Sequence, residues 1–154
     1  MSATLQASGS QLLQPNLACF QANVVDTISL TTSFVEQTIF TEVEINRGNH
    51  FNSSTGRFTA PTAGIYKFGT ALIGNSTNDV YRFNFYKNGS DTEFQLRVST
   101  NATGSEFGTN GQMEIYLDLA SGDYVSIFAK SDTGTDAYGA AGFKYSYFNG
   151  RFIA

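Results

Sequence analysis

The sequence predicts an all-β fold, either a sandwich or a barrel of short antiparallel strands. Apolar and polar residues alternate with the period of two that half-buried strands show, and clusters of Gly, Asn, Ser and Thr separate the alternating segments. No segment keeps a helical period over three turns. At 154 residues the chain has the length of one domain with a substantial apolar core.

The chain divides into a short polar segment and one domain. Residues 1–16 are rich in Ser and Gln and end at Pro15, so we expect a linker or attachment arm there and the domain over 17–154. Within the domain, strands are predicted in order at about 17–24, 38–46, 64–73, 80–86, 92–99, 112–119, 124–130 and 143–153.

Two hairpins are the clearest elements. In the first, Tyr81, Phe83 and Phe85 alternate with polar residues, and Asn88-Gly89 supplies the positive φ angles of a tight turn before the returning strand "TEFQLRVS". In the second, "QMEIYLDL" alternates in the same way, and "ASGD" turns into "YVSIFAK". Both hairpins indicate antiparallel pairing of neighbouring strands.

The aromatic content is high for one core of this size, with 14 Phe, 8 Tyr and no Trp. The last predicted strand carries aromatics on both faces: Phe143, Tyr145 and Tyr147 on one, Phe148 and Phe152 on the other. Burial on both faces would fit a sandwich interior on both sides or a subunit interface, whereas uneven packing of one core is the alternative.

Composition argues against two classes of partner. The net charge is −4 and the nine Lys and Arg residues are scattered, so no basic footprint for nucleic acid is present. No apolar run approaches the ~18 residues of a membrane span, and the first residues lack the pattern of a signal peptide. From the sequence alone we expect a soluble chain that is not exported by the usual route.

Groups that could perform catalysis are few. His50 is the only histidine and Cys19 the only cysteine, and no nucleophile motif accompanies either, so we expect no enzyme, with His50 at the surface and Cys19 a small apolar side chain. The acids Asp79, Asp91, Glu106, Asp132 and Asp136 lie in or beside predicted loops but form no Asp-x-Asp-x-Asp array. We expect solvated acids and no cofactor, with calcium as the alternative.

Long loops are the predicted place for recognition. With antiparallel strands from residue 64, the tight turns at 87–90 and 120–123 share one end of the fold, and the longer connections at 74–79, 99–110 and 131–142 share the other. Their short polar and aromatic groups suit sugar hydroxyls, although solubility alone would explain them. The candidate binding residues are Asn75, Asn78, Asp79, Asn101, Glu106, Asp132, Asp136 and Tyr138.

Residues 51–68 have the spacing F-x4-G-x-F-x2-P-x2-G-x-Y-x-F, in which Gly56 and Gly64 suit backbone conformations costly for other residues, Pro61 sets a bend, and Phe58, Tyr66 and Phe68 enter the core. With "ACFQANVV", "FNFYKNGS", "GTNGQMEIYLDLASGDYVSIFA" and "YFNGRFIA" in order, the sequence resembles the globular domain of the complement C1q and tumour necrosis factor superfamily over about 17–154. The resemblance implies a ten-stranded antiparallel jelly-roll sandwich that assembles as a homotrimer through aromatic-rich faces.

The kind of protein to which the domain belongs is predicted from its composition and from its differences from cellular members of the superfamily. Cellular members of the superfamily usually carry a secretion signal and a collagen-like stalk, and the sequence shows neither. A Lys-poor surface and a short polar arm favour a virion protein, such as a bacteriophage fibre tip or capsid decoration. It would be attached to a capsid or tail protein through residues 1–16 and present loops to a host-surface glycan or receptor. The alternative is a secreted or surface recognition or signalling module of a cellular organism.

Overall fold

The computed structural model describes residues 17–74, 79–100, 110–139 and 142–154 and shows two antiparallel sheets packed face to face. The described residues form twelve strands: β1 (Cys19–Asn23), β2 (Val35–Glu36), β3 (Glu42–Arg47), β4 (Phe51–Asn52), β5 (Arg57–Thr59), β6 (Gly64–Gly74), β7 (Asp79–Lys87), β8 (Ser90–Thr100), β9 (Asn110–Leu119), β10 (Tyr124–Ser131), β11 (Ala137–Tyr138) and β12 (Tyr147–Phe152). The all-β sandwich predicted from the alternating pattern is confirmed. The predicted arm at 1–16 lies outside the described residues.

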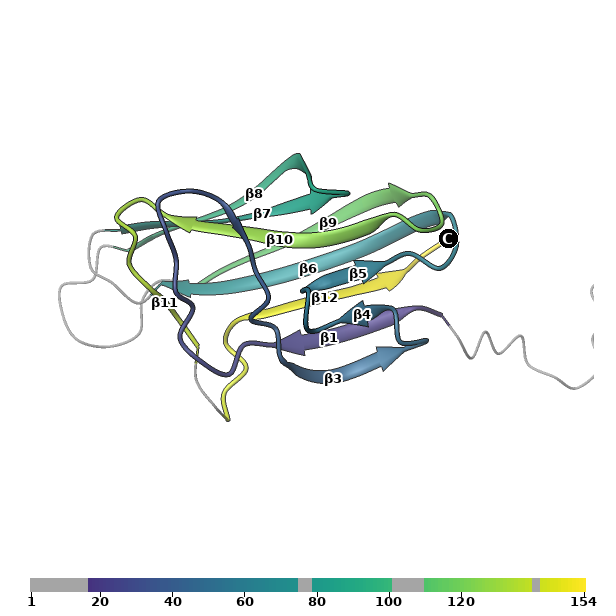
Figure 1. Cartoon of the computed structure of the whole chain (residues 1–154), viewed down its shortest axis with the longest axis horizontal. Helices are drawn as coiled ribbons and strands as arrows, with labels where there is room; N and C mark the ends of the chain where they lie inside the picture. The colour runs from purple at the N-terminus through teal and green to yellow at the C-terminus, as the bar shows by residue number, and fades with distance from the viewer. Residues whose placement is uncertain (1–16, 75–78, 101–109, 140–141) are drawn as a thin grey trace, which may run out of the picture.

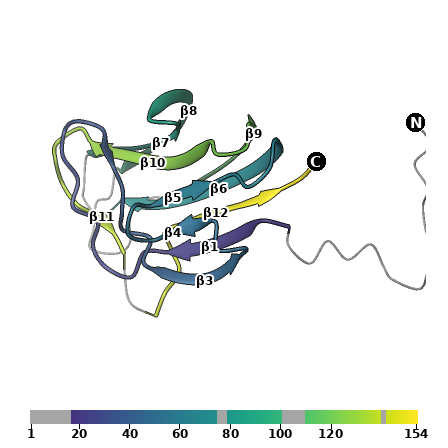
Figure 2. The same cartoon turned by 45° about the vertical axis from the view of Figure 1, so that its right-hand side comes forward.

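The strands are distributed over two sheets that form the layers of Figures 1 and 2. Sheet A has the order β11-β6-β12-β1-β3, with β9 on the other edge of β6, and sheet B has the order β4-β5-β10-β7-β8, with β2 also paired to β10. The chain's last strand, β12, therefore lies in the middle of sheet A, between β6 and β1.

The core between the sheets is aromatic. Phe58, Tyr66 and Phe68 of the spaced motif are fully buried, as predicted, and Phe20 stacks on Phe51 with ring centroids 4.5 Å apart. Phe148 of β12 meets Phe20 edge-on at 4.8 Å. Each buried large side chain contributes roughly 1.5–3 kcal/mol, so these rings account for much of the stability of the sandwich.

Two glycines of the spaced motif have the backbone role expected of them. Gly56 has a φ of 67°, and a Cβ there would lie 2.0 Å from the backbone oxygen of Gln37. Gly64 has a φ of 150°, and a Cβ would lie 2.3 Å from the backbone oxygen of Ala154. A side chain at either position would therefore clash with backbone as well as strain the chain.

The predicted strand at 143–153 is wrong in its first residues, because β12 begins at Tyr147. On this edge of β6, β12 pairs with residues as far as Ala71, and β11 pairs with Ile73 and Gly74. Residues 143–146 therefore cannot extend β12 along β6. Phe143 is instead 57% exposed. The outward face of β12 carries Asn149 and Arg151 next to Tyr147, and is not the second aromatic face that the sequence suggested.

The two tight turns lie together at one end of the sandwich, as the antiparallel order predicts. Asn88 adopts a φ of 52° in the β7–β8 turn. Its Nδ2 donates to Asp123 Oδ1 over 2.7 Å, and its Oδ1 accepts from the backbone N–H of Tyr124 over 2.9 Å. The side chain thus joins this turn to the β9–β10 turn. The strand ends Gly74, Asp79, Thr100 and Asn110 lie at the opposite ends of the same strands.

Candidate functional site

The long-loop end is organised around Asp79, the first residue of β7. This side chain was predicted to lie in a binding loop, but it is only 3% exposed. Its Oδ2 accepts hydrogen bonds from Ser131 Oγ at 2.6 Å and Thr133 Oγ1 at 2.8 Å, and also from Thr135 Oγ1. Its Oδ1 accepts from the backbone N–H of Val80 at 2.7 Å. The carboxylate therefore fastens the segment after β10 to the start of β7.

The electrostatics of this cluster favour the ionised acid. Burial raises the pKa of Asp79, but the hydroxyls of Ser131, Thr135 and Thr133 and the N–H of Val80 together outweigh it and lower the pKa from 3.8 to about 2. The charge is thus compensated by donors within the fold. Its described contacts give Asp79 the role of positioning the loop, and its role in binding stays a prediction.

The other candidate residues fall into two groups. Asp132 and Asp136 are exposed on the same segment, and Asp132 forms an ion pair with Arg82, which lowers the pKa of Asp132. Tyr138 lies in β11, opposite Ile73 of β6. The structure thus brings Asp79, Asp132, Asp136 and Tyr138 to one end of the fold. Asn75, Asn78, Asn101 and Glu106 lie outside the described residues.

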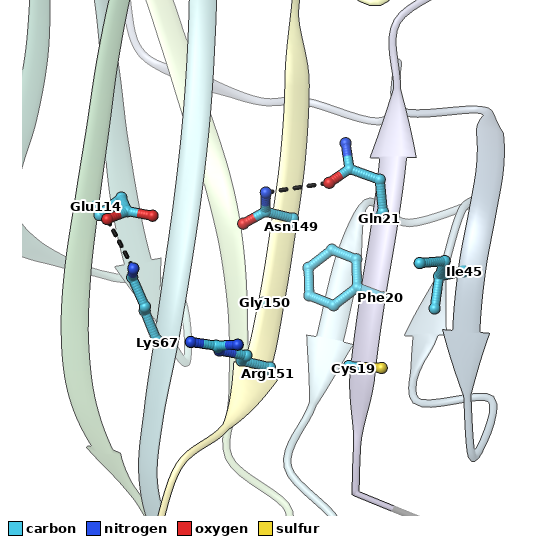
Figure 3. Close-up of a pocket in the computed structure, with 9 residues that line it drawn as sticks. All are labelled: Cys19, Phe20, Gln21, Ile45, Lys67, Glu114, Asn149, Gly150 and Arg151. Atoms are coloured by element: carbon cyan, nitrogen blue, oxygen red, sulfur yellow. Dashed lines mark hydrogen bonds and ion pairs between the residues drawn. The ribbon is translucent and has the colours of Figure 1, made fainter.

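A second candidate surface is the outer face of sheet A, which holds a shallow hollow of about 340 Å³. Figure 3 shows the hollow between Cys19 and Gln21 of β1 on one side and Lys67 of β6 on the other, with Asn149 and Arg151 of β12 between them. Next to Asn149, Gly69 of β6 puts no side chain on this face. A Cβ there would lie 2.7 Å from Asn149 Oδ1.

Polar groups across this hollow are only partly paired. Asn149 Nδ2 donates to Gln21 Oε1 at 3.0 Å (Figure 3). Gln21 Nε2 in turn donates to Asn23 Oδ1 at 2.9 Å. Lys67 forms an ion pair with Glu114 at 2.7 Å. The Nδ2 atom of Asn23 is buried without a hydrogen-bond partner, and Arg151 has no ion-pair partner among the described residues. Arg151 is exposed and is therefore available for a further contact on this face, whereas Asn23 is already buried within the chain.

Exposed apolar side chains border the hollow. Tyr116 of β9 is 59% exposed and stands next to Lys67, and Ile45 of β3 lines the opposite rim at 47%. Ile65 and Ile153 are exposed nearby, joined by a backbone hydrogen bond. This surface is not evident from the sequence, since the strand pattern indicates outer faces for Lys67 and Tyr116 without revealing that β6 and β9 are neighbours.

The two reactive side chains noted in the sequence are not brought together. His50 precedes β4 and meets the ring of Phe58 edge-on at 6.4 Å, whereas Cys19 lies on the outer face of sheet A. Within the part of the chain that the structure describes, no three His, Cys, Asp or Glu side chains gather where they could hold a metal ion. Nor does that part contain a helix that is long and apolar enough to cross a membrane.

The comparison with known families decides the relationship that the sequence motifs suggested. The family model of the C1q domain matches residues 19–153. The chain belongs to the C1q family. The C1q match covers both sheets in full, together with the hollow on sheet A and the loop end around Asp79.

Two curated C1q relatives of greater length are mouse proteins. Complement C1q tumor necrosis factor-related protein 7 is 28% identical over 110 residues, which are 70% of this chain and 36% of the relative. Complement C1q tumor necrosis factor-related protein 3 is 36% identical over 101 residues, which are 63% of this chain and 39% of the relative. The chain therefore spans less than two fifths of the length of these relatives, and neither of them indicates a bacteriophage origin.

Solved structures share the C1q fold at low sequence identity. The globular domain of zebrafish complement 1qA superposes with a TM-score of 0.62 and 17% identity, covering 90% of this chain and 98% of that one. Murine APRIL at pH 5.0 gives a TM-score of 0.64 and 12% identity, covering 89% of this chain and 99% of that one. Eiger TNF from S. frugiperda gives 0.61 and 13%, with 90% and 94% covered. The jelly-roll fold implied by the sequence motifs is thereby confirmed.

Proposed function

We propose that this chain is an extracellular C1q-type recognition module without enzymatic activity, which assembles as a homotrimer through the outer face of sheet A and presents its long-loop end to a ligand. The observation that carries the proposal is the combination on that face of exposed apolar side chains and exposed Arg151, which has no ion-pair partner among the described residues. Its setting is supported by the curated relatives, which are C1q and tumour necrosis factor-related proteins.

The composition of this face suits contact with copies of the same chain. Tyr116, Ile65 and Ile45 offer apolar surface, and the centre holds the hollow into which a neighbour's side chain could pack. Arg151 and Asp118 are both exposed on this side of sheet A, two strands apart, and neither has an ion-pair partner among the described residues. A self-complementary arrangement of opposite charges around an axis would pair them between copies.

The assembly is tested by measuring mass in solution. We expect light scattering to give three times the chain mass, and Tyr116→Arg to give the monomer, because it places a charge at the most exposed apolar position of this face. Phe94→Arg is the matched control: Phe94 is an aromatic of sheet B, 46% exposed, and its replacement should leave the trimer intact. A wild-type monomer, or equal effects of the two variants, would refute assembly through sheet A.

The recognition role is assigned to the end of the fold where Asp132, Asp136 and Tyr138 lie beside the Asp79 cluster. A rigid sheet carrying a loop segment fixed by internal hydrogen bonds is suited to presenting side chains to a ligand. A glycan array probed with the intact protein tests whether sugars are bound. Binding that persists after Asp136→Ala and Tyr138→Ala are combined would remove these residues from the site.

A virion protein attached through residues 1–16 ranks second. It is supported only by composition, namely the scarcity of Lys and the polar first segment, whereas the animal relatives favour the cellular module. The two settings differ in their genes. Neighbouring capsid and tail genes would favour the virion, and a reading frame that supplies a secretion signal and a collagen-like stalk would favour the extracellular module.

A further inference from the structure

Three cationic residues stand in one row across the outer face of sheet B. Arg97 of β8 lies directly opposite Arg82 of β7, and Arg82 lies directly opposite Lys130 of β10. All three alternate with buried residues of their strands, so they point away from the core. Like charges placed directly opposite each other on neighbouring strands destabilise a sheet. The row therefore holds three of the chain's nine Lys and Arg residues in an arrangement that the fold alone does not favour.

The positive charge of this row is only partly neutralised. Asp132 forms ion pairs with both Arg82 and Lys130, and Arg97 has no ion-pair partner among the residues that the structure describes. In the rows on either side, the paired positions are held by Gln95, Asn84 and Phe128, and by Ser99 and Val80, which are all uncharged. One carboxylate thus faces three cations, and an excess of two positive charges remains on a chain with a net charge of −4.

Two of the cations are held in place before any ligand arrives. The Arg82 side chain is only 18% exposed and the Lys130 side chain 24%. The Lys130 ammonium lies over the ring of Phe34, 5.4 Å from its centroid. Arg97 is the exposed member. Ordered cations lose less conformational entropy on binding than free ones, which favours capture of an anionic group.

The neighbours of the row suit a sugar better than a peptide backbone. Exposed Gln95 and Ser99 offer an amide and a hydroxyl on either side of Arg97. Phe128 stacks on Tyr86 with centroids 3.8 Å apart and presents a partly exposed aromatic surface in the next row. An acidic glycan requires polar groups that hydrogen-bond its hydroxyls and an aromatic ring for its apolar face. It also requires a guanidinium that pairs with its acidic substituent.

The row also adjoins the proposed recognition end. Arg82 lies three residues after Asp79 in β7, Lys130 immediately precedes Ser131, and Arg97 lies near the end of β8. We propose that Arg97, Arg82 and Lys130 form a binding site for an acidic glycan, one whose sugars carry sulfate or carboxylate groups. This inference rests on the proposed recognition function and specifies the chemical class of its ligand.

Calorimetry with sucrose octasulfate, a small and defined polyanionic sugar, tests the site on the full chain in 0.15 M salt. The wild type should bind it and should not bind sucrose. Arg97→Gln should weaken binding by about tenfold, the size of one charge-assisted contact. Arg97→Glu should abolish binding and yet raise the melting temperature, because it puts a carboxylate opposite Arg82. Loss of binding would then be separated from loss of folding.

Arg47→Glu is the matched control, since Arg47 is exposed on β3 of the other sheet, and the variant should bind octasulfate like the wild type. Equal loss in both charge reversals, no loss in Arg97→Gln, or tighter binding of polyglutamate than of octasulfate would overturn the inference. Light scattering on the same samples measures the mass of the assembly and so distinguishes failure of the glycan site from failure of the trimer. A trimer that ignores octasulfate overturns only the glycan site, and a monomer that binds it overturns only the assembly.

Discussion

At the scale of single residues, Asp79 is a buried carboxylate that depends on hydrogen bonds within the fold to stay ionised. It is buried, yet its charged form is favoured because three hydroxyls and two backbone N–H groups donate to the carboxylate. Removing the charge would leave Ser131 Oγ, Thr133 Oγ1 and Thr135 Oγ1 with a weaker acceptor in a water-poor site. The order of the segment that follows β10 thus depends on one ionised side chain.

This arrangement predicts acid sensitivity. The pKa of Asp79 is lowered from 3.8 to about 2 by folding, so the ionised acid stabilises the fold above pH ~4, and this contribution is lost as the pH falls towards 2. The shift corresponds to about 2 kcal/mol of unfolding free energy. Asp79→Asn should lower stability at pH 7 by about that amount and remove this part of the acid dependence, as measured by denaturant unfolding at several pH values.

The control for this prediction lies in the same segment. Asp136 is exposed, so Asp136→Asn should leave both the stability at pH 7 and its acid dependence close to those of the wild type. If Asp79→Asn kept the full acid dependence of the wild type, the carboxylate would not be the group responsible.

At the scale of elements, the two hairpins are held together by their turns. Asn88 supplies a positive φ to the β7–β8 turn and two side-chain hydrogen bonds to the β9–β10 turn. Asn88→Gly keeps the backbone conformation and loses only the hydrogen bonds, whereas Asn88→Ala loses both. We expect a cost of roughly 1–2 kcal/mol for Gly and about 1 kcal/mol more for Ala. Urea unfolding measures the difference, and equal costs would show that the φ angle is not limiting.

Elements with a sustained pattern were predictable from sequence. The alternation of Tyr81, Phe83 and Phe85 predicted β7, and Asn88-Gly89 predicted its turn, because period and turn chemistry are local properties. The two-residue strands β2, β4 and β11 have no period to detect. The late start of β12 depends on the competition of β11 for the same edge of β6, which no local pattern contains.

The candidate sites were predictable only in part, for the same reason. The antiparallel order placed the long loops at one end, but the burial of Asp79 depends on hydroxyls more than fifty residues away at Ser131, Thr133 and Thr135. The row of Arg97, Arg82 and Lys130 requires the register of three strands. The sequence shows each cation separately and gives no sign that they are neighbours.

At the scale of the whole molecule, the proposed trimer couples folding to assembly. If sheet A is buried between copies, unfolding must expose it, and the melting temperature should rise with protein concentration. Tyr116→Arg should remove this dependence, while Phe94→Arg should keep it. Scanning calorimetry over a hundredfold concentration range measures the effect. A melting temperature independent of concentration in the wild type would argue against a trimer that dissociates as it unfolds.

The central position of β12 in sheet A governs the order in which the molecule can form. Residues 147–152 pair with β1 at 19–23 and with β6 at 66–71, so β1 and β6 can be joined in the sheet only after this segment, which follows the other described strands in the sequence, has been synthesised. Among the described strands, sheet B contains none later than β10 and can pair earlier. Synthesis should therefore pass through a stage at which sheet B is paired and the aromatic core is still exposed. At that stage Phe20 and Phe68 lack their contacts with Phe148. Exposed apolar surface of this kind is what chaperones bind.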